Sequence, residues 1–244
     1  MKKILFAVLC SISFVFAMQT AHAQKMGFGI KGGLNFSTLS GDFTPSTTTL
    51  NKESVTGYNI GAYGYLGFNP LLALEAEVNY TQLGVKYSGI VSQIGTSTTS
   101  ITSNLTYNYI QIPILMRLQT GFSDFKVWGN VGPYVGLSLG GNNKSLETKV
   151  IGGIAGNITN LTPIDVPLKS GDDIQSVDFG VMAGAGIGYK VGPGYITFDA
   201  RYVLGLNKSF NSLTLGTTAN SLTVNYDDLK NRSIVLNLGY LFVF

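Results

Sequence analysis

The sequence is poor in charged residues, in cysteine and in histidine. Only 12% of its 244 residues are Asp, Glu, Lys or Arg, about half of the roughly 25% found in ordinary soluble proteins. That proportion is too low for the solvated surface of a soluble protein of this size. The formal net charge of +3 is weak, and no run of basic residues concentrates it, so we expect no nucleic-acid partner.

The N-terminal segment has the three parts of a secretory signal peptide. A basic start (Met1–Lys3) precedes the apolar stretch Ile4–Met18, which is too short for a membrane-spanning helix, and a small-residue cleavage site ends at Ala23. We therefore expect residues 1–23 to be removed and residues 24–244 to form the mature chain. Removal takes the only cysteine and the only histidine. The mature chain then has no disulfide and lacks the commonest acid–base group near neutral pH.

Long apolar runs are also missing from the rest of the chain. No later stretch reaches the 18 apolar residues of a spanning helix, although 45% of all residues are hydrophobic. Lipid permits one other spanning structure, the closed β-barrel, because every backbone polar group must be paired. The stretch Tyr195–Leu206 shows the matching period of two, with Ile196, Phe198 and Tyr202 alternating with polar residues.

Eight such alternating runs are present, and the connections between them alternate in length. We predict strands at residues 26–37, 55–69, 71–87, 104–120, 126–140, 176–191, 195–208 and 230–244. The long connections are residues 38–54, 88–103, 141–175 and 209–229, whereas the other three are tight turns. Short periplasmic turns and long external loops are typical of outer-membrane barrels. The sequence therefore predicts an all-β fold, a single eight-stranded antiparallel up-and-down transmembrane β-barrel.

The charged residues of these strands share the face opposite the apolar one. A Lys or Arg on the lipid face costs roughly 2–4 kcal/mol at the bilayer midplane, so we place these residues in the lumen. Because four are acidic and four basic, we interpret them as a structural ion-pair network, in which Arg117 pairs with Glu75 or Glu77 of the preceding strand. The eight residues are Lys31, Glu75, Glu77, Arg117, Asp178, Lys190, Asp199 and Arg201.

Other motifs favour packing over chemistry. The glycine-rich segment Gly184–Lys190 is followed by a turn and a strand, not by the helix of a phosphate-binding loop, so we expect its glycines to make room for large lumen side chains. Pro113 within a strand suggests a bulge. We expect no catalytic, cofactor-binding or metal-binding residue, and therefore no enzyme.

The chain ends in NLGYLFVF, and its last strand must close against its first. Tyr240, Phe242 and Phe244 share the lipid-facing parity and suit an aromatic girdle at the membrane interface. A terminal Phe with an aromatic residue four positions earlier looks like the signal by which outer-membrane barrels are passed to the barrel assembly machinery.

Four segments together carry a resemblance to a known family. They are GIKGGLNFS (29–37), YIQIPILMR (109–117), DFG to YK (178–190) and ARYVLGLN (200–207). The sequence resembles the PorT-like outer-membrane β-barrel proteins, often labelled porin family. The resemblance implies an exported protein of the Gram-negative outer membrane, embedded in outer-membrane lipid. It implies no residue roles, because none is established across that family.

Three functions remain open from the sequence. The first is a barrel with a filled lumen that is structural or binds an unidentified external ligand through its four long loops. The second is a narrow passive diffusion pore, and the third is an accessory role in secretion or envelope assembly. A monomer is expected in each case, because a closed ring leaves no strand edge to pair.

Overall fold

The computed structural model describes residues 25–41, 50–94, 96–151, 158–160, 163–211, 213–216, 221–224 and 229–244. The expected signal peptide, residues 1–23, lies outside these ranges. Within them, no helix is long and apolar enough to span a membrane.

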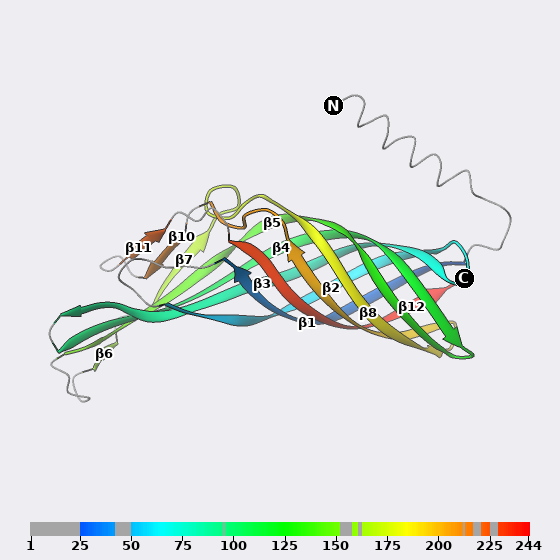
Figure 1. The fold of residues 1–244 in the computed structure, drawn as a ribbon, viewed down its shortest axis with the longest axis horizontal. Coiled ribbons are helices and arrows are strands. Elements are labelled where there is room, and N and C mark those ends of the chain that lie inside the picture. Colours follow the sequence, from blue (N-terminus) through cyan, green and yellow to red (C-terminus); the bar gives the residue numbers. More distant parts are fainter. Residues whose placement is uncertain are drawn as a thin grey trace, which may run out of the picture.

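Eight long antiparallel strands form a closed ring, shown from the side in Figure 1. Each long strand pairs with the next along the chain, and the last pairs with the first from Gly27 opposite Val243 to Ser40 opposite Lys230. The predicted eight-stranded up-and-down barrel is therefore confirmed. In ring order the strands are β1 (Lys25–Ser40), β2 (Leu50–Gly67), β3 (Leu72–Ile94), β4 (Ser97–Phe122), β5 (Phe125–Val150), β8 (Val177–Val191), β9 (Gly194–Gly205) and β12 (Lys230–Val243).

The three tight turns all lie at the end of the barrel that carries the C-terminus (Figure 1). In the first, the Asn69 side-chain oxygen accepts hydrogen bonds from the N–H groups of Leu71 and Leu72 at 2.9 and 2.8 Å. The second contains Ser123 with φ 49°, and the third contains Gly192 with φ 61°. Side-chain capping and left-handed residues let the chain reverse within a few residues. Short turns of this kind are typical of the periplasmic end of outer-membrane barrels, and this end is called the periplasmic end below.

At the external end, three strands run far beyond the membrane. β4 and β5 each have 26 residues, more than twice the roughly 9–11 that a tilted strand needs to cross. The expected loop 88–103 is therefore wrong, because β3 and β4 continue through it with only residues 95 and 96 between them. Its threonines are β-branched and its Ile101 is buried, which suits a pleated strand.

Short strands occupy two of the other long connections. β7 (Ile164–Leu168) and β6 (Ile158–Asn160) pair with the outer part of β5. β10 (Leu213–Gly216) and β11 (Ser221–Val224) form a separate hairpin. The external parts of β3 (residues 84–94), β4 (residues 97–106) and β5 (residues 142–150), together with β7, are called the external sheet below.

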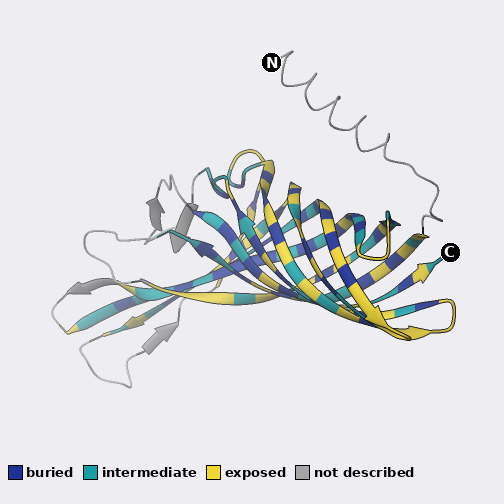
Figure 2. Cartoon of the chain, turned by 45° about the vertical axis from the view of Figure 1, so that its right-hand side comes forward, coloured by how far each residue is buried: buried dark blue, intermediate teal, exposed yellow. Residues whose placement is uncertain are grey.

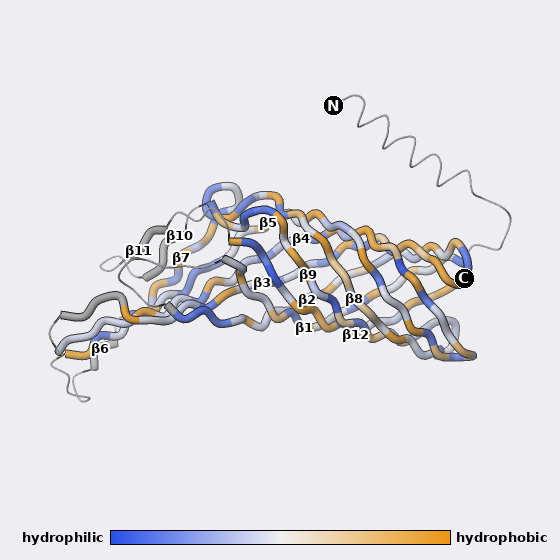
Figure 3. Tube along the Cα trace, in the orientation of Figure 1, coloured by the Kyte–Doolittle hydropathy of each residue, from blue (hydrophilic) through white to orange (hydrophobic). Residues whose placement is uncertain are grey.

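Exposed and buried residues alternate along the barrel strands, as Figure 2 shows. The exposed positions are apolar, for example Ile60, Ile114 and Leu238, and Figure 3 shows the matching alternation of hydropathy. This apolar exterior is the lipid-facing belt that the period of two predicts.

The strand register corrects one detail. Pro113 lies opposite Tyr134 on β5 and Met116 lies opposite Val131, so no residue is inserted between them. The bulge expected at Pro113 is therefore wrong; the register shifts at Asn108 and Tyr109 instead. A proline removes one ladder hydrogen bond but does not by itself add a residue to the strand.

Candidate functional site

Six charged side chains form one connected cluster inside the barrel. They come from four strands and every one of them is at most 6% exposed. Three are acidic and three are basic, so the cluster is formally neutral. Its members are Lys31 on β1, Glu75 and Glu77 on β3, Arg117 on β4, and Asp199 and Arg201 on β9.

The central ion pair crosses the lumen. Arg201 Nη1 lies 2.9 Å from Glu77 Oε1, and Arg201 Nη2 lies 3.7 Å from Glu75 Oε2. β9 and β3 are four positions apart in the ring of eight, in either direction, so these side chains meet from opposite walls. An eight-stranded barrel is just narrow enough for its own side chains to fill it.

Further ion pairs complete the cluster. Lys31 Nζ lies 2.7 Å from Glu77 Oε2, and Arg201 Nε lies 2.6 Å from Asp199 Oδ1. Arg117 Nη1 contacts Glu75 Oε1 at 2.5 Å, which places the arginine against one of the two glutamates expected from sequence.

Buried amides supply the remaining hydrogen bonds to the carboxylates. Asn130 donates to Glu75, Asn79 donates to Glu77 at 2.9 Å, and Asn237 donates to Asp199 at 3.2 Å. Asn237 in turn accepts a hydrogen bond from Asn59 at 2.8 Å. A buried ion pair gains stability when its remaining polar atoms are also bonded. These asparagines bond part of them, whereas Arg117 Nε, Asn79 Oδ1 and Asn130 Oδ1 have no hydrogen-bond partner among the described residues.

Trp128 closes the periplasmic side of the cluster. Its ring lies 3.7 Å from the centre of the Arg117 guanidinium, a cation–π contact. A Cβ atom at Gly186 would lie 2.5 Å from two ring carbons of Trp128, and Gly188 lies under the same ring. The glycine-rich segment therefore makes room for this tryptophan, as the sequence interpretation expected of its glycines.

Two of the eight predicted lumen charges lie outside the cluster. Asp178 is buried but accepts hydrogen bonds from Tyr134 at 2.9 Å and from Asn231 at 3.0 Å, with no ion pair among the described residues. The placement of Lys190 in the network is wrong. It has lumen parity but is exposed, because it is the penultimate residue of β8 beside the periplasmic turn.

Apolar side chains fill the lumen on the external side of the cluster. Leu115, Tyr134, Met182, Val203 and Val235 form one layer. Beyond it, Ile174, Phe210 and Leu229 from the external connections pack against Leu39 and Tyr107, with the Phe210 ring edge-on to Tyr107 at 5.1 Å. We call Ile174, Phe210 and Leu229 the external cap.

Hydrogen bonds join the connections that carry the cap. The backbone N–H of Gln175 donates to the Ser209 carbonyl at 3.0 Å, and Asn211 donates to the carbonyls of Asp173 and Gly171. The sequence interpretation missed this cap. The available signal was the isolation of Ile174, Phe210 and Leu229 as large apolar residues in otherwise polar stretches.

The C-terminal aromatics lie on the outside of β12. Phe242 and Phe244 are exposed, and the Tyr240 hydroxyl donates to the Val191 carbonyl at 2.6 Å. The backbone of Phe244 exchanges two hydrogen bonds with Met26 at the start of β1.

The described residues contain no group of three Asp, Glu, His or Cys side chains that could hold a metal ion. The acidic members of the lumen cluster are instead engaged by lysine, arginine and asparagine.

Comparisons with solved structures find outer-membrane proteins of low sequence identity. OprG from Pseudomonas aeruginosa is 14% identical, with 88% of this chain and 95% of that chain covered and a TM-score of 0.41. Ail from Yersinia pestis, in complex with a heparin analogue, is also 14% identical, with 89% and 99% covered and a TM-score of 0.37. The protease OmpT from Escherichia coli is 8% identical, with 93% and 99% covered and a TM-score of 0.38. No curated protein matches the sequence.

A family model matches most of the chain. It is described as the outer membrane protein beta-barrel domain, and it aligns with residues 19–211. The closed ring and its apolar exterior agree with a location in the bacterial outer membrane, where lipid replaces water around the strands. The chain belongs to the outer membrane protein beta-barrel domain family.

Proposed function

We propose that this protein is a non-conducting barrel that binds an external ligand through its external sheet. The single observation that carries the proposal is the Arg201–Glu77 ion pair across the lumen. It joins opposite walls at the level where a pore would have to pass. The external cap adds a second, apolar barrier farther out.

The external sheet supports the binding part of the proposal. β3, β4 and β5 carry it well beyond the length needed to cross the membrane. One face of its central strand bears hydroxyl and amide groups, including Thr102, Asn104 and Thr106. A rigid polar platform of this kind presents hydrogen-bonding groups without the ordering cost of a mobile loop.

Single-channel recording of the refolded protein in a planar bilayer tests the closed lumen. We expect no conductance steps from protein shown to be folded by its resistance to unfolding in detergent. Reproducible steps that change when Glu77 or Arg201 is substituted would overturn the proposal and favour the diffusion pore.

Shortening the external sheet tests the binding part. Removing residues 88–103 and joining β3 to β4 with a two-residue turn should leave the barrel folded, because these residues lie beyond the lumen cluster. Cells that display the shortened protein should adhere less to neighbouring cells than cells that display the full chain. Unchanged adhesion by the shortened protein would contradict binding through the external sheet.

We also propose the finer assignments that follow from the sequence. The four segments of resemblance support membership of the PorT-like branch, and the N-terminal pattern supports cleavage after Ala23. The exposed Phe242 and Phe244 support recognition of Tyr240–Phe244 by the barrel assembly machinery. The closed ring supports a monomer, because it leaves no strand edge to pair. The ion pairs that hold the buried carboxylates support a protein without enzymatic activity.

A further inference from the structure

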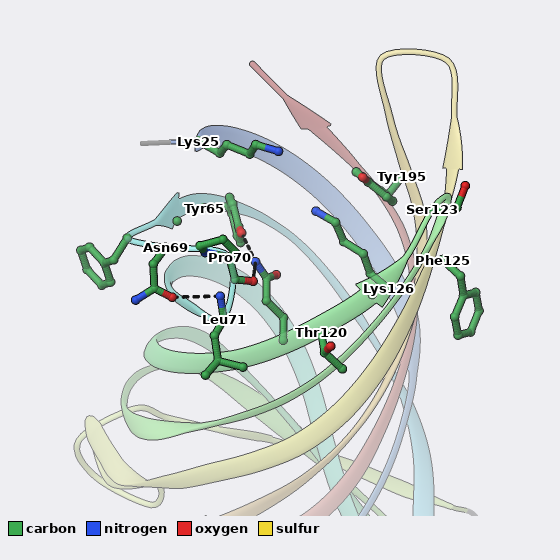
Figure 4. A pocket seen from close by; sticks show the side chains of 14 residues that line it. Lys25, Tyr65, Asn69, Pro70, Leu71, Thr120, Ser123, Phe125, Lys126 and Tyr195 are labelled. Atoms are coloured by element: carbon green, nitrogen blue, oxygen red, sulfur yellow. Dashed lines mark hydrogen bonds between the residues drawn. The ribbon is translucent and has the colours of Figure 1, made fainter. Parts of the chain in front are cut away.

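A hollow of about 610 Å³ opens at the periplasmic end of the barrel. It lies between the start of β1, the turn after β2, the end of β4 and the starts of β5 and β9 (Figure 4). Its volume is within the roughly 300–1,000 Å³ of small-molecule sites. The lumen cluster and Trp128 form the barrel interior beyond it, so the hollow is a blind pocket and not part of a channel.

The hollow is positively charged. Lys25 and Lys126 line it, and none of its described lining residues is acidic. Neither lysine forms an ion pair within the described part of the chain. Lys126 Nζ instead lies 4.2 Å from the centre of the Tyr195 ring. Two unneutralised cations in a concave site attract an anion.

The hollow also contains an unpartnered buried acceptor. Gln119 is 7% exposed, and its side-chain nitrogen donates to the Tyr65 hydroxyl at 2.6 Å. Its side-chain oxygen Oε1 has no hydrogen-bond partner among the described residues. A buried acceptor without a partner costs free energy, so a ligand that donates a hydrogen bond would be favoured here.

The remaining lining residues suit a ring bearing hydroxyl groups. Tyr195, which is partly exposed, contributes an aromatic ring, and Ser123 in the turn between β4 and β5 contributes a hydroxyl group. Figure 4 shows Tyr195 beside Lys126 on one side of the hollow and Tyr65 on another. Flat rings and hydroxyl groups bind the apolar face and the polar edge of a sugar, whereas a simple inorganic anion would use only the lysines.

We propose that this hollow binds an anionic sugar from the periplasm, a hexose bearing a carboxylate or a phosphate. The acidic group contacts Lys25 and Lys126, a sugar hydroxyl donates to Gln119 Oε1, and the sugar ring lies against Tyr195. This site is separate from the external sheet, so it does not depend on the proposed binding of an external ligand.

Calorimetric titration of the folded protein in neutral detergent tests the site. The probes are N-acetylmuramic acid for a carboxylate source, glucose 1-phosphate for a phosphate source, neutral N-acetylglucosamine, and inorganic phosphate. We expect saturable binding of one or both anionic sugars, at least tenfold tighter than of N-acetylglucosamine or inorganic phosphate. The better of the two anionic sugars identifies the source. Trp128 provides a second readout, because it is the only tryptophan and lies two residues from Lys126 on the same face of β5.

Matched variants separate the site from general charge effects. Lys126→Gln and Lys25→Gln should each weaken binding at least tenfold, whereas Lys190→Gln, an exposed lysine at the same end but outside the lining, should leave it unchanged. Absence of saturable binding would overturn the proposal. Equal binding of neutral and anionic sugars would also overturn it, as would equal binding of inorganic phosphate, which would leave only an unspecific anion site.

Discussion

Replacing Glu77 by glutamine should destabilise the barrel far more than replacing an exposed glutamate. Glu77 is 2% exposed and holds both Lys31 and Arg201. Glutamine keeps the volume but removes the negative charge, so the neutral cluster becomes a buried net cation. Breaking a buried ion pair in this way costs about 3–5 kcal/mol, which is roughly a hundredfold or more in the unfolding equilibrium constant.

The chain provides its own control for this change. Glu53 forms an ion pair with Lys86 at 3.0 Å, but their side chains are 53% and 38% exposed. Exposed pairs contribute about 0–1 kcal/mol, so Glu53→Gln should be nearly silent. Urea unfolding of the refolded proteins in lipid vesicles, followed by Trp128 fluorescence, gives both values.

A compensating variant tests the electrostatic cause. Lys31 forms its ion pair with Glu77 alone among the described residues, so adding Lys31→Met to Glu77→Gln restores a neutral cluster. The double variant should be more stable than Glu77→Gln. A loss below about 1 kcal/mol for Glu77→Gln, as in an exposed pair, would refute the reasoning, because it would mean that water fills the lumen.

Three further changes test other parts of the structure. Gly186→Ala should lower the free energy of unfolding by roughly 1–3 kcal/mol, because the new methyl group meets the Trp128 ring. Gly129→Ala, where the nearest atom is 3.7 Å away, should change that free energy little. Equal losses for the two variants in urea unfolding would contradict the packing of Trp128 against Gly186. Phe244→Ala keeps the backbone bonds to β1, so refolding in vitro should be unchanged while the heat-modifiable fraction in cell membranes falls; normal assembly would disprove the signal. Phe210→Ala should cost roughly 3–5 kcal/mol and expose the external connections to added protease on intact cells, and unchanged cleavage would show that the cap is not needed.

Much of the barrel wall could be predicted from the sequence because two constraints coincide there. Strand side chains alternate with a period of two, and lipid penalises a misplaced charge. Parity therefore assigned Glu75, Glu77 and Arg201 to the interior. Parity carries no information about depth along the barrel axis, so it places Lys190 in the cluster although this residue lies at the periplasmic rim.

The external end was harder to predict for two physical reasons. A strand of Ser, Thr and Asn outside the membrane has little hydrophobic contrast between its faces. The start of β4, residues 97–103, therefore has the sequence pattern of a loop. The external cap depends on contacts between residues far apart in sequence, such as Phe210 with Tyr107. The pairing of Arg201 with Glu77 across the lumen could likewise not be predicted, because it depends on closure of the ring.

That closure has a consequence for how the protein is made. β1 can pair on its closing side only after β12 has been made. The residues that the two strands bring together, such as Gly27 and Val243, are separated by almost the entire chain. Contacts this distant slow folding, since the entropy of a very long loop is lost before they form. The chain therefore emerges and crosses the periplasm with both terminal strands as open edges, and the period of greatest risk of aggregation lies between export and the joining of its two ends.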